Sequence, residues 1–475
     1  MGISFWHRPL RARKTPPVEA MTPAPAPHPA PSKPLPDNTQ VLRVAIPVVL
    51  SGLSTPLIGL IDTAAVGQLG DAKYIGAVAL GALIFTFLYW AFGFLRMGTT
   101  GLTAQAYGAE NGVEIRACLG RALFIALAAG CGLILLQLPL EFAAFTLVGA
   151  EADAEALART YFDIRIWSAP FALANFALLG WFIGLQRMRT ALALQLFLNG
   201  MNAGLDALFV FVFEMGVAGI AYGTLIAEIS AALAGLFLAV RVLKSVPGGW
   251  NLAALKDKAA LARTIAVNRD IMIRTLLLLF AFAFFTAQSA GHGNEVLAAN
   301  TILMQFVSFA AYFLDGFAFA AEALVGEALG AKRREAFARA VKLSTLWAAG
   351  ISLLLSAGFA LSGPFFIALL TTAEPVRALA GTYLVWAAIL PIASVWCYQL
   401  DGIFIGATRT GEMRNAAIFS LAVFLACWWL FQPLGNHGLW AAFTLFALMR
   451  AFSLAVYYPR LAAHSAGAAA DLRGF

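Results

Sequence analysis

The feature that most constrains this chain is a series of long apolar segments that begins near Val41 and continues almost to the C-terminus. A helix needs about 20 residues to cross the hydrocarbon core of a bilayer, and each segment runs for roughly 18–28 residues. Lipid offers the backbone no hydrogen-bond partners, so segments of this length must be helical, whereas strands of a membrane barrel would be short and alternating. The sequence therefore predicts an all-α integral membrane protein whose twelve transmembrane helices span 42–66, 74–96, 115–138, 158–185, 190–212, 217–241, 271–290, 296–321, 340–361, 378–406, 413–432 and 438–458.

The composition excludes an ordinary soluble protein. Hydrophobic residues make up 61% of the chain and charged residues 12%, whereas soluble domains carry about 45–50% apolar and about 25% charged residues. There is too little charge to coat the surface of soluble domains of this total length. The net charge of +7 arises from basic residues between the apolar segments, so we expect it to set topology in the lipid and expect no nucleic-acid partner.

The distribution of basic residues predicts the orientation. If the N-terminus is cytoplasmic, 28 of the 32 Lys and Arg residues fall at the inner side of the membrane, and the exceptions are Lys73, Arg159, Arg165 and Arg377. Basic residues gather on the cytoplasmic side of membrane proteins. We therefore expect a multi-pass protein with both termini in the cytoplasm, which agrees with an even number of helices.

The two halves of the chain resemble each other at a shift of about 222 residues. The segment at Tyr107 matches the one at Leu329, and the Phe-Ile-Gly that begins at Phe182 matches the one that begins at Phe404. A parallel repeat of two six-helix lobes is typical of transporters that bind cargo between the lobes and alternate its access. The expected parts are a disordered Pro/Ala-rich tail, an N-lobe, a cytoplasmic linker, a C-lobe and a C-terminal tail, at residues 1–37, 38–241, 242–270, 271–460 and 461–475.

Ionisable residues inside the membrane mark candidate functional positions, because burying a charge in lipid is unfavourable. Asp62 lies near the outer end of the first helix, and Asp206 lies in the outer part of the fifth. Asn199, Asn202 and Asp206 fall on one helical face. Two carboxylates that face each other at low dielectric do not both ionise readily, so one would hold a proton. The pattern favours a proton site, although Asp62 at a helix end also fits an interfacial residue.

Two further residues of the sixth helix extend this candidate site. Glu228 lies about eleven residues into that helix, and Thr224 precedes it by one turn. Glu228 fits either a cation site or a buried acid whose hydrogen bonds are satisfied within the fold.

The second half carries Asp315, Glu322, Glu327 and Asp401. Asp315 and Asp401 lie in the inner parts of their helices, with Arg274 and Arg409 expected near the same face. We favour a salt-bridged cytoplasmic gate or a structural pair, and a second ion site is the alternative.

Motifs for other chemistry are missing from the sequence. It contains no Walker-type phosphate loop, no His-Glu-x-x-His and no Gly-x-Ser-x-Gly. The four cysteines lie inside apolar stretches without metal-ligand spacing. We therefore expect no catalytic residues, no metal and no cofactor, and we do not expect an enzyme.

Several long motifs, in order along the chain, resemble the MATE (multidrug and toxic compound extrusion) transporters. They are PLIGLIDTA at 56–64, LRMGTTGLTAQ at 95–105, LDGFA at 314–318 and DGIFIGATR at 401–409. NRDIM at 268–272 and GNHGLW at 435–440 resemble the DinF-like branch (the DNA-damage-inducible protein F group). The similarity extends from about Leu42 to Tyr458.

The resemblance implies a bacterial inner-membrane antiporter, expected to be a monomer in contact with lipid, that exports small organic, cationic or lipophilic compounds in exchange for H⁺ or Na⁺. It also implies a proton-coupling network, made of Asp62, Asn175, Asn202, Asp206 and Thr224. The related NorM-like branch uses an acid on the seventh helix, which this chain lacks within 271–290. This absence favours H⁺ as the coupling ion. A Na⁺-coupled exporter and a lipid or lipid-linked flippase of the same fold remain the alternatives.

Overall fold

The computed structural model describes residues 34–67, 72–148 and 152–467, without the side chains of 55–66, 72, 147–148 and 464–467. The chain divides into two units, Met1–Leu35 and Pro36–Phe475, and the second of these contains every helix described below.

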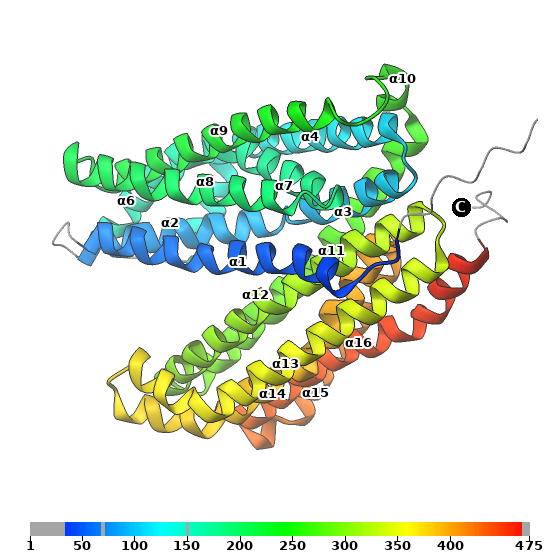
Figure 1. The fold of residues 1–475 in the computed structure, drawn as a ribbon. Coiled ribbons are helices and arrows are strands. Elements are labelled where there is room, and N and C mark those ends of the chain that lie inside the picture. The colour runs from blue at the N-terminus through cyan, green and yellow to red at the C-terminus, as the bar shows by residue number, and fades with distance from the viewer. Residues whose placement is uncertain (1–33, 68–71, 149–151, 468–475) are drawn as a thin grey trace, which may run out of the picture. The chain divides into compact units, whose positions relative to one another are not determined.

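The described residues form helices and no strand, which confirms the predicted fold class. Eleven helical stretches within them are long and apolar enough to cross a membrane. The first predicted span, 42–66, falls on α1, Asn38–Gly67, whose side chains are described only in part. Turns of three residues or fewer separate many of the helices, which are shown in Figure 1.

The first half builds the N-lobe. Its elements are α1 (Asn38–Gly67), α2 (Ala72–Trp90), α3 (Phe94–Gly108), α4 (Gly112–Leu135), α5 (Gln137–Val148), α6 (Ala152–Arg165), η1 (Ile166–Ser168), α7 (Ala169–Gly184), α8 (Met188–Ala207), η2 (Leu208–Val212) and α9 (Gly216–Leu243). The motif at 95–105, which the apolar pattern leaves between two spans, is helical as part of α3.

The second half builds the C-lobe after the one-turn helix α10 (Leu252–Leu255). Its elements are α11 (Lys258–Gly291), α12 (Asn294–Gly330), α13 (Arg334–Leu370), α14 (Glu374–Gly406), α15 (Thr410–Leu430), η3 (Gln432–Leu434) and α16 (Asn436–Gly467). Residues 258–270 of the expected linker are therefore helical and continue into the first span of this lobe. Asp257 caps α11 by accepting hydrogen bonds from the first backbone N–H groups.

The internal repeat is visible in the turns. Glu110 and Lys332 end corresponding helices with φ of 54° and 55°, and Gln186 and Thr408 do so with φ of 57° and 55°. This left-handed conformation is uncommon for residues other than glycine. Its recurrence at the same shift shows that the two lobes share their backbone geometry as well as their sequence pattern.

The two lobes meet at one end through a seam in which α3 packs against α12. A Cβ atom on Gly108 would overlap the carbonyl oxygen of Glu327, and a Cβ atom on Gly330 would overlap that of Gln105. These two contacts are related by the repeat. Glycine is required at both positions because a backbone carbonyl of the other lobe occupies the place of the side chain.

Polar contacts complete the seam. Gln105 donates from Nε2 to the carbonyl oxygen of Gly406 at 2.9 Å. Arg263, from the first turns of α11, donates to Gln105 Oε1 at 2.8 Å and to Thr408 Oγ1 at 2.9 Å. Gln186 of the N-lobe donates to a Glu327 carboxylate oxygen of the C-lobe. The lobes are therefore closed against each other at the end that carries the connection between them.

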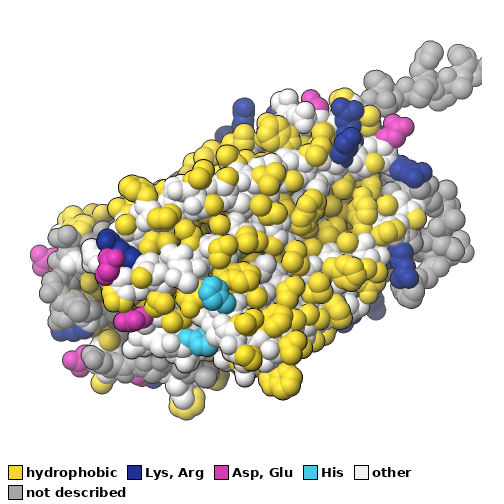
Figure 2. All heavy atoms as spheres, turned by 90° about the horizontal axis from the view of Figure 1, so that it is seen from below, with side chains coloured by type: hydrophobic (Ala, Val, Ile, Leu, Met, Phe, Trp, Pro, Cys, Tyr) yellow, Lys and Arg dark blue, Asp and Glu magenta, His cyan; other side chains and the backbone are white. Residues whose placement is uncertain are grey.

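Each lobe has its own apolar core. Phe85 and Phe162 are buried in the N-lobe core, and Phe285 and Trp440 are buried in the C-lobe core. Hydrophobic side chains cover most of the face shown in Figure 2. An apolar exterior around apolar cores is what a protein surrounded by lipid requires.

Candidate functional site

A buried polar cluster in the N-lobe joins α8 to α9. Asn202 donates from Nδ2 to Asp206 Oδ2 at 2.8 Å and to Thr224 Oγ1 at 3.2 Å. Asp206 has no exposed surface, and Asn202 and Thr224 are each 8% exposed. The structure thus brings three of the predicted site residues into direct contact.

The local backbone makes room for the Asp206 carboxylate. A Cβ atom on Gly223 would overlap Asp206 Oδ1, so a glycine on α9 is needed opposite the acid. Directly after Ala207 the chain forms η2, a π-helical stretch over Leu208–Val212. Asp206 therefore lies in the last turn of α8, directly before the helix changes its hydrogen-bond pattern and ends.

Asn199 connects the same face of α8 to α1. It donates from Nδ2 to Ser54 Oγ at 2.7 Å and accepts from Gln195 Nε2 at 2.9 Å. Asp62 belongs to α1, but its side chain lies outside the described residues. The predicted partnership of Asp62 with Asp206 therefore stays a prediction.

Asn175 pairs with Glu228 rather than with the cluster around Asp206. Its Nδ2 donates to Glu228 Oε2 at 2.6 Å and to the Glu228 backbone oxygen at 3.1 Å. Glu228 follows Thr224 by one turn of α9, so this pair lies next to the cluster. The N-lobe thus holds two adjacent polar groups, each with one carboxylate and at least one amide.

In the C-lobe, the carboxylate of Asp401 is paired with two arginines. Asp401 Oδ2 accepts from Arg274 Nη2 and, at 2.5 Å, from Arg450 Nη2. Arg409, expected near the same face, instead pairs with Glu412 at 2.7 Å. Arg450 is one of the basic residues predicted at the cytoplasmic side. Apolar residues surround it in the sequence, and α16 continues past it.

One further charge pair crosses between the lobes. Arg96 of α3 lies 3.6 Å from Glu322 of α12, and its guanidinium stacks at 3.8 Å over the ring of Phe319. Glu322 is 1% exposed. Asp315 lies on the same helix within electrostatic reach of Arg96. The sequence indicates Glu322 without a partner, because hydropathy shows that Arg96 ends a predicted span but not which helix its side chain faces.

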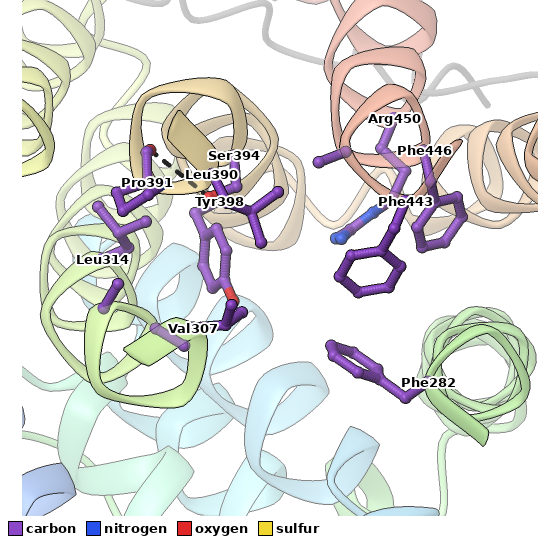
Figure 3. Close-up of a pocket in the computed structure, with 13 residues that line it drawn as sticks. Phe282, Val307, Leu314, Leu390, Pro391, Ser394, Tyr398, Phe443, Phe446 and Arg450 are labelled. Carbon is purple, nitrogen blue, oxygen red and sulfur yellow. Dashed lines mark hydrogen bonds between the residues drawn. The ribbon is translucent and has the colours of Figure 1, made fainter. Parts of the chain in front are cut away.

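The C-lobe also contains a small cavity, with a volume of about 40 Å³. Figure 3 shows the Arg450 guanidinium extending toward it, with Phe282, Phe443 and Tyr398 around it. A water molecule needs roughly 10–15 Å³ by this measure, so the cavity accommodates a few waters beside the Arg450–Asp401 pair.

Comparison with known proteins decides the family. The MatE family model matches residues 47–208 and 271–429. The chain belongs to the MatE family. The two matched regions of the MatE model fall on the two lobes, as expected for a family built from a parallel repeat.

Relatives and solved structures agree with the MatE assignment. The chain is 40% identical over 418 residues to DNA damage-inducible protein F of Escherichia coli (strain K12), covering 88% of this chain and 91% of the relative. It is 23% identical over 277 residues to the multidrug export protein MepA of Staphylococcus aureus, covering 58% of this chain and 61% of the relative. A solved structure described as MATE in the bent conformation superposes with a TM-score of 0.83 at 20% identity and covers 92% of this chain and 98% of that chain. The predicted resemblance and fold are confirmed, and the chain is a multi-pass membrane protein.

Proposed function

We propose that this protein exports small organic compounds, cationic or lipophilic, in exchange for protons, by alternating access between its two lobes. The buried cluster of Asp206, Asn202 and Thr224 is the observation that carries the proposal. A carboxyl group at full burial changes its charge state when water or a cation reaches it, because burial penalises the charged form. The names of the relatives, a multidrug export protein among them, support efflux as the direction of transport.

The seam supports a specific conformational state. We place its closed end in the cytoplasm, because 28 of the 32 Lys and Arg residues belong to that side in the topology with cytoplasmic termini. The arrangement is then outward-open, with cargo leaving and protons entering on the outer side. In this cycle a proton binds Asp206 or Asp62 from outside, and the cationic cargo loses its counter-charge.

Proton coupling is favoured over sodium coupling by the state of the C-lobe acids. Asp401 is held by two arginines, and Asp270, the acid at the basic end of α11, is paired with Arg414 at 2.8 Å. A sodium site needs oxygen ligands that are free to surround the ion. The positive charge of the arginines beside Asp401 and Asp270 opposes the binding of a further cation there.

The test is dye efflux in inverted membrane vesicles from cells that lack their main efflux pumps. We expect ethidium uptake into the vesicles under an imposed ΔpH alone and none under a Na⁺ gradient at clamped pH. Each unit of ΔpH supplies about 1.4 kcal/mol per proton. Uptake driven fully by Na⁺ at clamped pH would refute proton coupling, and no uptake under either gradient would refute efflux of organic cations.

A further inference from the structure

A second charged region of the N-lobe lies next to the cluster around Asp206 and is not used by the proton cycle. Glu228 is half-buried on α9, and its carboxylate accepts a hydrogen bond from the neutral amide of Asn175. Within the described part of the chain, Glu228 makes no ion pair. A carboxylate that keeps its charge here therefore lacks a counter-charge from the protein at ion-pair distance.

A guanidinium approaches the same region from α6. Arg165 donates from Nη1 to the hydroxyl of Tyr161 and lies 4.9 Å from the ring centroid of Phe85. It lies within electrostatic range of Glu228 and of Tyr89, whose hydroxyl shares a hydrogen bond of 3.0 Å with Ser168. Arg165 has no carboxylate within 4.0 Å among the described residues. One negative and one positive group thus share this region without pairing.

Two polar atoms at these positions lack hydrogen bonds among the described residues. They are Asn175 Oδ1, an acceptor, and Arg165 Nε, a donor. Asn175 is 8% exposed, so its amide oxygen is buried beside Glu228. A buried polar atom without a partner is unfavourable, and a ligand that supplies the missing partner gains accordingly. The missing partners are a donor beside Glu228 and an acceptor beside Arg165.

The repeat shows that the fold itself does not require these charges. The C-lobe position that corresponds to Glu228 is Arg450, and the one that corresponds to Arg165 is Ala387. Arg450 is paired within its own lobe with Asp401, whereas Glu228 has no ion pair among the described residues. The same backbone position therefore tolerates opposite charges, and the unpaired charges of the N-lobe are specific to that lobe.

We propose that Glu228, Asn175 and Arg165 form a cargo subsite for aromatic zwitterions, in which Glu228 and Asn175 bind a cation that carries N–H donors and Arg165 binds a carboxylate. Tyr89, Tyr161 and Phe85 provide aromatic surface beside the guanidinium. The inference rests on the proposed efflux of organic compounds and names their class. Asp206 remains the proton-carrying group. Asn202 connects it to Thr224, which lies one turn of α9 before Glu228.

Two dyes that differ at one group provide the test. Rhodamine 110 carries an aminoxanthene cation and a free carboxylate, and rhodamine 123 is its methyl ester, which keeps the cation alone. Binding of each dye to the purified full-length protein in detergent is measured by fluorescence polarisation at fixed pH, without any gradient. We expect the wild type to bind the acid more tightly than the ester.

The variants separate the two charges. Arg165→Gln should weaken binding of the acid by about tenfold, the loss expected for one hydrogen bond to a charged group, and leave the ester within about twofold. Glu228→Gln should weaken both dyes by about tenfold. The matched controls are Arg159→Gln, on the same helix but paired with Glu141 and Glu155, and the exposed Glu214→Gln; both should bind as the wild type does.

Retained binding of the ester by Arg165→Gln shows that this variant is folded. Equal losses of both dyes in Arg165→Gln, unchanged binding in Glu228→Gln, or tighter binding of the ester by the wild type would each overturn the subsite. These measurements involve no proton gradient. Failure of ΔpH-driven transport would therefore refute the proposed coupling and leave the subsite standing.

Discussion

The two lobes have corresponding helices but opposite chemistry at corresponding positions. Asn202, Asp206 and Thr224 of the N-lobe correspond to Phe424, Trp428 and Phe446 of the C-lobe. In the C-lobe these rings pack within an aromatic cluster. The ring centroids of Phe424 and Phe446 are 5.5 Å apart, and those of Phe284 and Trp428 are 4.9 Å apart.

This difference shows that the fold does not require polar residues at these positions. Aromatic packing at these positions stabilises a lobe by burying apolar surface. An acid with an amide and a hydroxyl buries polar groups that must all be satisfied and contributes less to stability. The polar version in one lobe is therefore explained by a task that only this lobe performs, which we propose to be proton exchange.

Two buried acids of the C-lobe differ from Asp206 in that each lies beside an arginine. Asp401 is shared by two arginines, and Glu322 faces Arg96 of the other lobe. Each of these pairs places a positive charge directly beside a carboxylate, and removing either partner would leave the other buried without its counter-charge. The comparison assigns charge exchange to the N-lobe and charge fixation to the C-lobe, and the following experiments test that division.

The largest effect is expected from Asp206→Asn. Asparagine keeps the volume of the side chain and imitates its protonated form, so ΔpH-driven efflux should fall to the level of vesicles without the protein while the melting temperature changes little. The same result is expected for Asp62→Asn. The control is Asp163→Asn, an exposed acid of the same lobe. Near-normal efflux by Asp206→Asn at equal expression would remove this residue from the mechanism.

The next effect is expected at the seam that both lobes share. Gly108→Ala and Gly330→Ala each place a methyl group where a carbonyl oxygen of the other lobe lies, so closure at this end should be prevented and transport should fall by roughly tenfold or more. Spin labels at the exposed positions 187 and 332 would report a longer distance between the lobes.

Gly350→Ala is the matched control for the seam, because a Cβ atom there meets no heavy atom within 4 Å. This variant should transport normally and gain about 0.5–1 kcal/mol of helix stability. Unchanged label distances in both seam variants would show that the glycine contacts do not hold the lobes together.

A smaller effect, on stability rather than coupling, is expected from Asp401→Asn. The substitution leaves Arg274 and Arg450 without their shared carboxylate and should lower the free energy of unfolding by about 3–5 kcal/mol. Thermal unfolding in detergent would measure the loss, and the remaining folded protein should still respond to ΔpH. A variant of normal stability that has lost its response to ΔpH would instead place charge exchange in the C-lobe.

The smallest effect is expected from Trp428→Phe, at the C-lobe counterpart of Asp206. The edge-to-face contact with Phe284 would be weakened, at about 0.5–1.5 kcal/mol for such a pair. ΔpH-driven efflux at equal expression should match that of the wild type. Loss of coupling in this variant would show that the two lobes are not divided as proposed.

The sequence by itself determined the helices and their repeat. Hydropathy and length predict twelve spans, because a helix in lipid must satisfy its backbone internally whatever its neighbours are. The one-sided spacing of Asn199, Asn202 and Asp206 also follows from helical periodicity alone. These are local properties, and the described helices agree with them.

Only the tertiary structure decided which side chains meet. Asn175 pairs with Glu228, Arg450 reaches Asp401, and Arg96 crosses to Glu322 because of how each helix is rotated and inclined against its neighbours. Periodicity fixes a residue's direction from its own helix axis but not the neighbour it faces. The closed end of the seam could not be predicted from the sequence either, because it depends on contacts between residues more than two hundred positions apart, such as Gly108 and Glu327.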